Sequence, residues 1–293
     1  MLTRRRTLLL AAAAGASAGF AASRAWPAAP RRVVIAGGDL TEIAFALGAG
    51  DMVAGADTTA SWPPEAAALP KIGYMRRLSA EGVLSLNPDF VILGEGAGPE
   101  TAIAQLEAAG VVLARGPGRE GVETVPAKIA FMGAALGREA EATALIADFE
   151  AEMAALEAAL APIETRPSVL FLISAGRGAP LASGENTAAA AVIALAKGRN
   201  AVTGFEGYKP LSAEAAIAAA PEALLLPAHA VEALGGVDPV LARPEIAATP
   251  AGRDGRVIVM DGLKLLGFGP RTPEAVAELA RALHPDRAGD IVL

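Results

Sequence analysis

Short apolar runs alternate with amphipathic stretches along most of the chain, a pattern typical of strands that alternate with helices. In the first half, apolar runs predict strands at 32–36, 52–56, 89–93 and 111–113. Helices are expected to start near Asp39 and Ser79 and to span 101–109. Asp39 and Glu42 have the spacing of a capping box, so Asp39 is expected to cap the first helix. Because strands that alternate with helices form βαβ units, this half predicts a mostly parallel sheet.

The segment 124–160 interrupts this alternation because it contains no apolar run of the strand type. Gly137 ends a first short helix, and a second helix is predicted from Glu139 to Leu160, about 33 Å long at 1.5 Å per residue. Apolar residues recur along it every three or four positions, as on one face of a helix: Leu145, Phe149, Met153, Leu156 and Leu160. We expect this helix to be a rigid connector between two lobes, with little hinge motion.

The alternation resumes after this helix and repeats part of the first half. Strands are predicted at 168–173, 222–226 and 256–260, and helices at 187–196, 212–220 and 272–283. Leu78-Ser79-Ala80-Glu81 returns as Leu211-Ser212-Ala213-Glu214 at an offset of 133 residues, and Pro88 returns as Pro221 at the same offset. We therefore predict an α/β fold of two lobes, each a mostly parallel sheet flanked by helices and joined by one long helix. Its parts are an N-terminal lobe (24–123), a linker helix region (124–163) and a C-terminal lobe (164–293), and a cleft between such lobes is a ligand site.

Residues 1–23 are predicted to be a signal peptide and not part of the fold. Arg4-Arg5-Arg6 precedes an apolar run shorter than the ~20 residues of a membrane span, and small residues follow it. The paired arginines are consistent with the twin-arginine export route. We expect an exported protein that works in the periplasm.

Composition excludes several functions. The net charge of −7 argues against the clustered basic surface that nucleic-acid binding requires, so nucleic acid is not an expected partner. The chain has no Cys and only two His, which lie far apart, so it shows no thiolate or His-rich metal pattern. No nucleophile–base pair and no pair of acid–base carboxylates stands out, and we predict a binding protein, not an enzyme.

The two tyrosines mark the same place in both halves. Tyr74 lies in a loop just before the helix at Ser79, and Tyr208 lies in the corresponding stretch before Ser212. Strand-to-helix loops of α/β lobes face the ligand crevice. Neighbouring Arg76 and Arg77 favour the anionic form of the Tyr74 phenol, and a phenolate is a known axial ligand of haem iron. The same guanidinium groups can hold carboxylates, whereas a Tyr that only packs locally is the simpler alternative.

Two acidic residues form the second repeated feature. Glu81 and Glu214 lie in the first turn of equivalent helices, where the helix dipole alone favours a carboxylate. Their equivalent positions in the two lobes allow a shared role. Trp62, which precedes Pro63, could line the cleft or cover the core, and of the two we expect packing against the core.

The chain resembles the haem-binding periplasmic proteins of bacterial haem ABC transporters, within the helical-linker class of cobalamin-, siderophore- and haem-binding proteins. The resemblance covers nearly everything after the signal segment, and Gly-Tyr-Met-Arg at Gly73 is its most specific part. The stretches that carry it are Gly37 to Ile43, Gly73 to Gly82, Gly184 to Ala189, Gly204 to Pro210 and Leu265 to Arg271.

This resemblance implies ferric haem b as the cargo, with Tyr74 as the iron ligand and Arg76 beside the phenolate or a propionate. The further haem-binding residues it implies are Arg77, Tyr208, Lys209 and Arg271. It also implies that Glu81 and Glu214 dock onto an inner-membrane ABC permease with its ATPase, downstream of an outer-membrane haem receptor pathway.

The second axial ligand and the number of haems stay open at this point. So do two other functions: a protein of the same fold that carries a ferric siderophore or cobalamin, and an exported haem-using enzyme.

Overall fold

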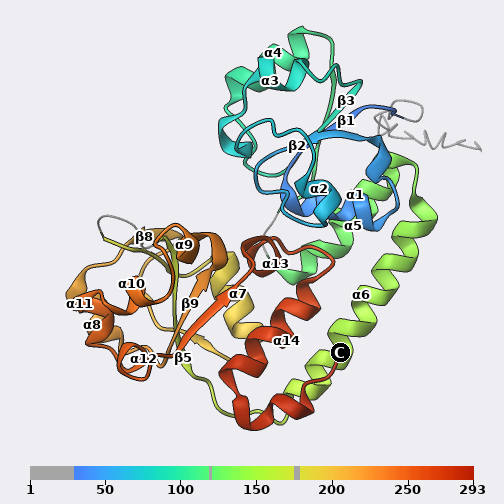
Figure 1. Ribbon diagram of the computed structural model, residues 1–293. Helices are drawn as coiled ribbons and strands as arrows, with labels where there is room; N and C mark the ends of the chain where they lie inside the picture. The colour runs from blue at the N-terminus through green and yellow to red at the C-terminus, as the bar shows by residue number, and fades with distance from the viewer. Residues whose placement is uncertain (1–29, 119–120, 175–178) are drawn as a thin grey trace, which may run out of the picture.

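The computed structural model describes residues 30–118, 121–174 and 179–293, so the predicted signal peptide at 1–23 lies outside the described residues. Two α/β lobes lie next to each other, and the long helix α6 (Glu139–Leu160) runs along one side of the molecule (Figure 1). The predicted fold class is confirmed, and α6 has the bounds that the sequence predicted.

The N-terminal lobe is built on a four-stranded parallel sheet in the order β2-β1-β3-β4. Its strands are β1 (Val33–Ala36), β2 (Val53–Ala56), β3 (Phe90–Leu93) and β4 (Val112–Arg115). Its helical elements are α1 (Gly38–Ala46), η1 (Gly50–Met52), α2 (Pro64–Ala67), η2 (Met75–Arg77), α3 (Ala80–Leu84) and α4 (Glu100–Ala108). Both central strands are fully buried, as the uninterrupted apolar runs indicated.

Successive residues of β1 point into two different cores. Val33 and Ile35 join the cluster that contains α1 and the following helices, whereas Val34 packs on the opposite face with Ile72 and Met75. This alternation follows from the two-residue period of a strand. It also anchors the 72–78 segment directly on the sheet.

Two helices lead from one lobe to the other. After η3 (Val122–Thr124), α5 (Val125–Leu136) ends at Gly137, which adopts the left-handed conformation with φ 65°, and α6 follows. The buried cluster that begins on β1 continues through both helices to the sheet of the second lobe, so the lobes share one core. Within 30–118, 121–174 and 179–293, no helix combines the length and apolarity that crossing a membrane requires.

The C-terminal lobe contains a mixed sheet in the order β10-β9-β5-β6-β8, with β7 paired to β5. Its strands are β5 (Ser168–Ser174), β6 (Leu181–Ser183), β7 (Arg199–Asn200), β8 (Tyr208–Pro210), β9 (Ala223–Pro227) and β10 (Val257–Met260). The strands that the sequence predicted pair in parallel, whereas β6 and β8 add an antiparallel edge.

The helices of this lobe cover the mixed sheet and reach the lobe junction. They are α7 (Ala188–Leu195), α8 (Ala213–Ala219), α9 (Ala228–Glu232), α10 (Asp238–Leu241), α11 (Pro244–Ala247), α12 (Pro250–Arg253), α13 (Gly262–Leu266), α14 (Thr272–Leu283) and η4 (Pro285–Asp290). In Figure 1, α13 lies where the two lobes meet and α14 lies beside α6.

The start of α1 differs from the sequence prediction. Its N-cap residue is Gly37, no side chain caps the helix, and Asp39 lies within the first turn. The Asp39 carboxylate binds Lys128 Nζ at 2.9 Å, and Glu42 binds Arg271 instead of returning to the helix terminus. The capping-box prediction is wrong because ion pairs with distant segments recruit both carboxylates.

Candidate functional site

The carboxyl ends of β1, β2 and β3 form one edge of the N-terminal sheet, and the loop that carries Tyr74 is attached to this edge. Met75 is fully buried; its N–H donates to Asp57 Oδ2 at 3.2 Å, and its carbonyl accepts from Gly98 N at 2.9 Å. The side chain of Met75 also reaches Gly94, directly after β3. Met75 therefore anchors the segment 73–78, which we call the Tyr74 loop.

Three polar side chains of the Tyr74 loop are exposed around this anchor. The Tyr74 side chain is 39% exposed although its neighbour Met75 is fully buried. Arg76 and Arg77 follow on the single turn η2, and both are exposed. The structure thus places the predicted iron ligand and two predicted haem-binding arginines on one short, anchored loop.

Asp57 is a buried carboxylate at the same edge that the sequence analysis missed. Oδ1 accepts from Gly37 N at 3.0 Å and from the Thr59 hydroxyl at 2.9 Å, and Oδ2 accepts from the N–H groups of Thr59 and Met75. Burial raises the pKa of the Asp57 carboxyl, and these hydrogen bonds lower it by a smaller amount. A signal was present in the sequence, since Asp57 directly follows the apolar run of β2 at a carboxyl strand end.

In the C-terminal lobe, Tyr208 and Lys209 lie on β8 and not in a loop. The Tyr208 ring is 37% exposed and meets Phe171 of β5 edge-on, with 6.2 Å between ring centroids. Lys209 Nζ lies 5.3 Å from the centroid of Phe205. The two tyrosines are therefore not structurally equivalent, because the antiparallel β6–β8 pair has no counterpart among the described residues of the N-terminal lobe.

Arg271 lies at the junction of the two lobes. Its Nε and Nη2 donate to the two carboxylate oxygens of Glu42 at 3.0 and 2.7 Å, and its guanidinium lies 4.9 Å from the centroid of the Trp62 ring. Trp62 is 43% exposed, so the expectation that it packs against the core is wrong: its face is used by a cation.

A second buried ion pair lies at the same junction. Lys128 Nζ, fully buried, binds Asp39 and donates to the carbonyls of Gly267 and Phe268 at 3.1 and 3.0 Å. Both pairs connect the start of α1 with the segment between α13 and α14, so charged groups from both lobes and from α5 fix the geometry of the junction.

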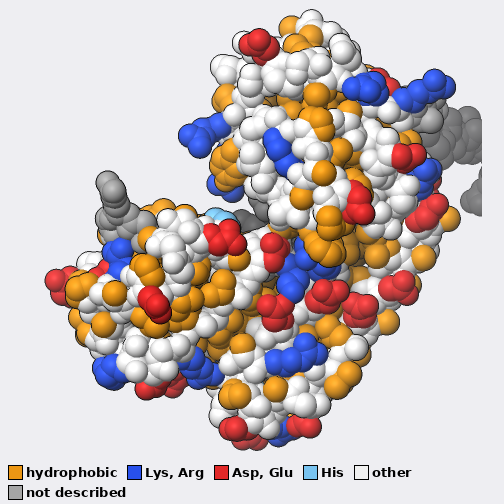
Figure 2. Space-filling model, viewed as in Figure 1, with side chains coloured by type: hydrophobic (Ala, Val, Ile, Leu, Met, Phe, Trp, Pro, Cys, Tyr) orange, Lys and Arg blue, Asp and Glu red, His pale blue; other side chains and the backbone are white. Residues whose placement is uncertain are grey.

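Figure 2 shows a hollow between the two lobes that opens on the side away from α6. Glu81 and Glu214 are exposed in the first turns of α3 and α8, whose N-caps Ser79 and Ser212 accept from Gly82 N and Ala215 N. In the C-terminal lobe, the pKa of Glu214 is lowered by hydrogen bonds from the backbone N–H of Glu214 and from the Ser212 side chain. Figure 1 places α3 and α8 on the sides of their lobes that face away from α6.

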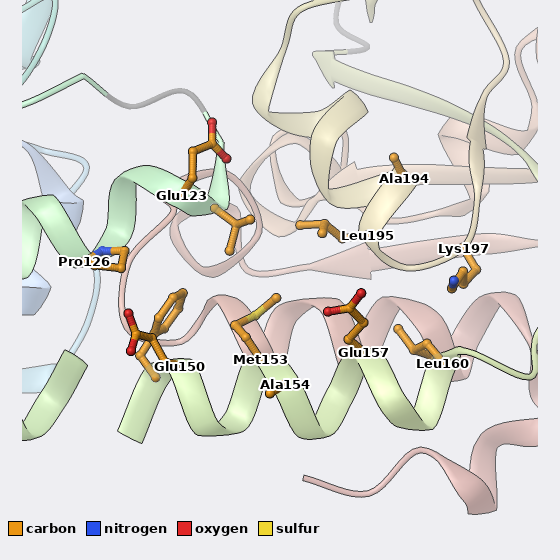
Figure 3. A pocket seen from close by; sticks show the side chains of 12 residues that line it. Glu123, Pro126, Glu150, Met153, Ala154, Glu157, Leu160, Ala194, Leu195 and Lys197 are labelled. Carbon is orange, nitrogen blue, oxygen red and sulfur yellow. The ribbon is translucent and has the colours of Figure 1, made fainter. Parts of the chain in front are cut away.

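A separate cavity of about 520 Å³ lies behind the junction, between α6, the start of α5 and α7 (Figure 3). Apolar side chains of α6, including Met153 and Leu160, point into it, and Glu123, Glu150 and Glu157 surround them. None of the predicted site residues lines this cavity, so it is distinct from the hollow between the lobes.

Two α/β lobes with a shared core, a helical connector and an open hollow between them define a two-lobed binding protein with a helical linker. The chain belongs to the periplasmic binding protein family, whose sequence profile matches residues 33–262.

Solved structures of this type cover nearly all of the chain. The periplasmic haem-binding protein RhuT from Roseiflexus sp. RS-1 has 46% identity and a TM-score of 0.83 over 88% of this chain and 99% of its own. The periplasmic haem-binding protein BhuT, solved with two haems, has 44% identity and a TM-score of 0.81 over 90% and 100%. A periplasmic haem-binding protein from Pseudomonas aeruginosa has 37% identity and a TM-score of 0.80 over 87% and 93%.

Curated relatives match over shorter stretches. An ABC transporter substrate-binding lipoprotein of Bacillus subtilis, YvrC, is 32% identical over 126 residues, and a vitamin B12-binding protein of Photorhabdus laumondii is 31% identical over 84 residues. These matches span 40% and 30% of the relatives' own lengths. The solved vitamin B12-binding protein of Vibrio cholerae, at 20% identity, shares the fold.

Proposed function

We propose that this protein captures ferric haem b in the periplasm and delivers it to an inner-membrane ABC permease and its ATPase. The observation that carries the proposal is the exposed Tyr74 phenol on a loop whose neighbour Met75 is buried against the sheet edge. Four haem-binding periplasmic proteins at 32–46% identity, each aligned over 87–90% of the chain, support haem as the cargo.

The chemistry of the Tyr74 loop fits this cargo. The loop carries the Tyr74 phenol together with the guanidinium groups of Arg76 and Arg77, and a phenolate is a suitable donor to haem iron. The same arginines can pair with the propionates by charge-assisted hydrogen bonds. Tyr208 and Lys209 are proposed contacts on the other wall of the hollow.

Arg271 is the weakest of the proposed haem contacts. Glu42 already accepts from its Nε and Nη2, so most of its charge is compensated before any propionate approaches. We assign it primarily to the lobe junction, where its guanidinium lies over the Trp62 ring.

Glu81 and Glu214 are proposed to dock the loaded protein onto the permease. Both residues are exposed in the first turns of α3 and α8, and these helices lie on the sides of their lobes that face away from α6 (Figure 1), the side on which the hollow opens (Figure 2). A permease that contacts both would therefore cover the entrance to the hollow. The same proposal includes export by the twin-arginine route through the signal peptide at 1–23 and an outer-membrane haem receptor upstream. It also divides the chain into an N-terminal lobe (24–123), a linker helix region (124–163) and a C-terminal lobe (164–293).

Cobalamin is the second candidate cargo, since a vitamin B12-binding protein matches 29% of the chain at 31% identity. The test is to titrate the purified mature protein with ferric haem, cyanocobalamin and a ferric siderophore, and to follow absorption and tryptophan fluorescence. We expect saturable binding of haem alone, with a high-spin ferric tyrosinate spectrum. Binding of cobalamin or the siderophore without haem binding would overturn the proposal, and turnover of a substrate by the haem complex would favour an enzyme.

A further inference from the structure

The buried Asp57 carboxylate ties together three segments at the carboxyl edge of the N-terminal sheet. It accepts from Gly37 N at the end of β1, from the backbone and hydroxyl of Thr59, and from Met75 N in the Tyr74 loop, at 2.9–3.2 Å. Asp57 is fully buried, and its own N–H donates to Ile35 O of β1 at 3.1 Å. Its side chain is therefore fixed to the sheet itself.

The same segment fixes the Tyr74 loop on both sides of Tyr74. Thr58 N donates to the carbonyl of Gly73 at 2.9 Å, and Asp57 Oδ2 accepts from Met75 N at 3.2 Å. Gly73 has φ 90°, a conformation that L side chains rarely adopt, so the chain turns directly before Tyr74. The peptide groups on both sides of Tyr74 are thus attached to residues 57–58, while the phenol itself is exposed.

We infer that Asp57 is a positioning residue for haem binding: it holds the backbone of Tyr74 so that the phenol oxygen is presented to the iron. This inference rests on the proposed function. Residues that orient a metal ligand from behind typically change metal affinity about 10- to 100-fold when replaced. Asp57 suits this role because both of its oxygens accept, and an amide would turn an N–H₂ group toward backbone N–H groups.

An exposed carboxylate that also accepts from two backbone N–H groups occurs elsewhere in the same lobe and provides a control for the loss of such hydrogen bonds. Asp89 accepts from Arg31 N at 2.9 Å and from Arg32 N at 3.1 Å, just before β1. This places Asp89 at the amino end of β1, whereas Asp57 and the Tyr74 loop lie at the carboxyl edge. If Asp→Asn replacement acts by a general loss of loop order, haem binding should change in both Asp57→Asn and Asp89→Asn. If it acts by loss of Tyr74 positioning, haem binding should change only in Asp57→Asn.

The experiment compares Asp57→Asn, Asp89→Asn and Thr59→Val in the mature protein, with ferric haem as the probe. For Asp57→Asn we expect haem affinity to fall about 10- to 100-fold and the high-spin tyrosinate absorption and EPR signals to weaken. Asp89→Asn should keep wild-type affinity and spectrum. Thr59→Val removes the hydroxyl from Asp57 Oδ1 but leaves the Oδ2–Met75 hydrogen bond, so it should lower Tm and preserve the tyrosinate spectrum.

A wild-type tyrosinate spectrum and affinity in a folded Asp57→Asn protein would overturn the inference. If that variant does not fold, amide exchange of the wild-type apo protein decides instead. Met75 N–H should exchange as slowly as the N–H groups of β1, and exchange as fast as in an exposed loop would refute the inference. Two further results separate the proposals: wild-type protein that does not bind haem overturns the proposed function itself, whereas Tyr74→Phe that binds haem with an unchanged spectrum shows that Tyr74 is not the iron ligand and removes the basis of the Asp57 inference alone.

Discussion

The ion pair between Glu42 and Arg271 allows a quantitative test of how the lobes are held together. Glu42 belongs to α1 of the N-terminal lobe, and Arg271 directly precedes α14 of the C-terminal lobe. Their side chains are 6% and 16% exposed, and the contact is bidentate. Arg271→Ala would leave the Glu42 carboxylate buried without this partner and would also remove the cation over the Trp62 ring.

The expected cost follows from this geometry. Removing one partner of a buried ion pair costs about 3–5 kcal/mol, because the remaining charge stays desolvated. Since Arg271 is partly exposed, we take the lower end, about 3 kcal/mol, with roughly 0.5–1 kcal/mol more for the lost contact with Trp62. At about 2–4 °C per kcal/mol for a protein of 150–250 residues, a total loss of about 3.5–4 kcal/mol should lower Tm by roughly 7–16 °C.

Thermal unfolding of the apo protein, followed by circular dichroism and calorimetry, measures this change. The control is Arg115→Ala, which removes an exposed ion pair in which Arg115 Nη2 donates to both carboxylate oxygens of Glu100; the two side chains are 52% and 77% exposed. That change should cost less than about 1 kcal/mol. Equal Tm shifts for the two variants, or a loss below about 1 kcal/mol for Arg271→Ala, would refute the view that the Glu42–Arg271 pair stabilises the junction.

Two further predictions concern pH and transport. Burial lowers the pKa of His284 below its ordinary 6.5, so the unfolded chain binds a proton more readily than the folded protein. The free energy of unfolding should therefore decrease as the pH falls below about 6.5. Urea unfolding at pH 5.5 and 7.5 should show this loss, and His284→Gln should reduce it. Unchanged pH dependence in His284→Gln would contradict this account. Glu81→Lys with Glu214→Lys should leave haem binding normal but abolish haem uptake through the reconstituted permease, and full uptake would remove the docking role.

Regular elements with a long periodic pattern could be predicted from the sequence. The bounds of α6 and α14 match the prediction because local signals define them: α6 follows the Gly137 stop of α5 and ends just before Pro162, and α14 has Pro273 in its first turn. The strands β6 and β8 could not be predicted, because three residues are too few to show a two-residue period and their pairing depends on distant segments. By analogy with Tyr74, the stretch around Tyr208 was expected to be a loop. It forms the strand β8 because it pairs with β6.

The candidate site divides in the same way. Tyr74, Arg76 and Arg77 could be proposed from the sequence because they lie together in one motif. Asp39 and Glu42 were misinterpreted as a capping box, because the local spacing is correct while their partners Lys128 and Arg271 lie 89 and 229 residues away. Asp57 was missed because its four donors come from three segments that only the parallel sheet brings together.

The measurement that tests the central claim most directly is the absorption spectrum of the ferric haem complex for wild type, Tyr74→Ala and Tyr208→Phe. We predict a high-spin tyrosinate spectrum for wild type and for Tyr208→Phe, and its loss in Tyr74→Ala. A tyrosinate spectrum that persists in Tyr74→Ala, or that disappears in Tyr208→Phe, would contradict the assignment of the iron to the Tyr74 loop.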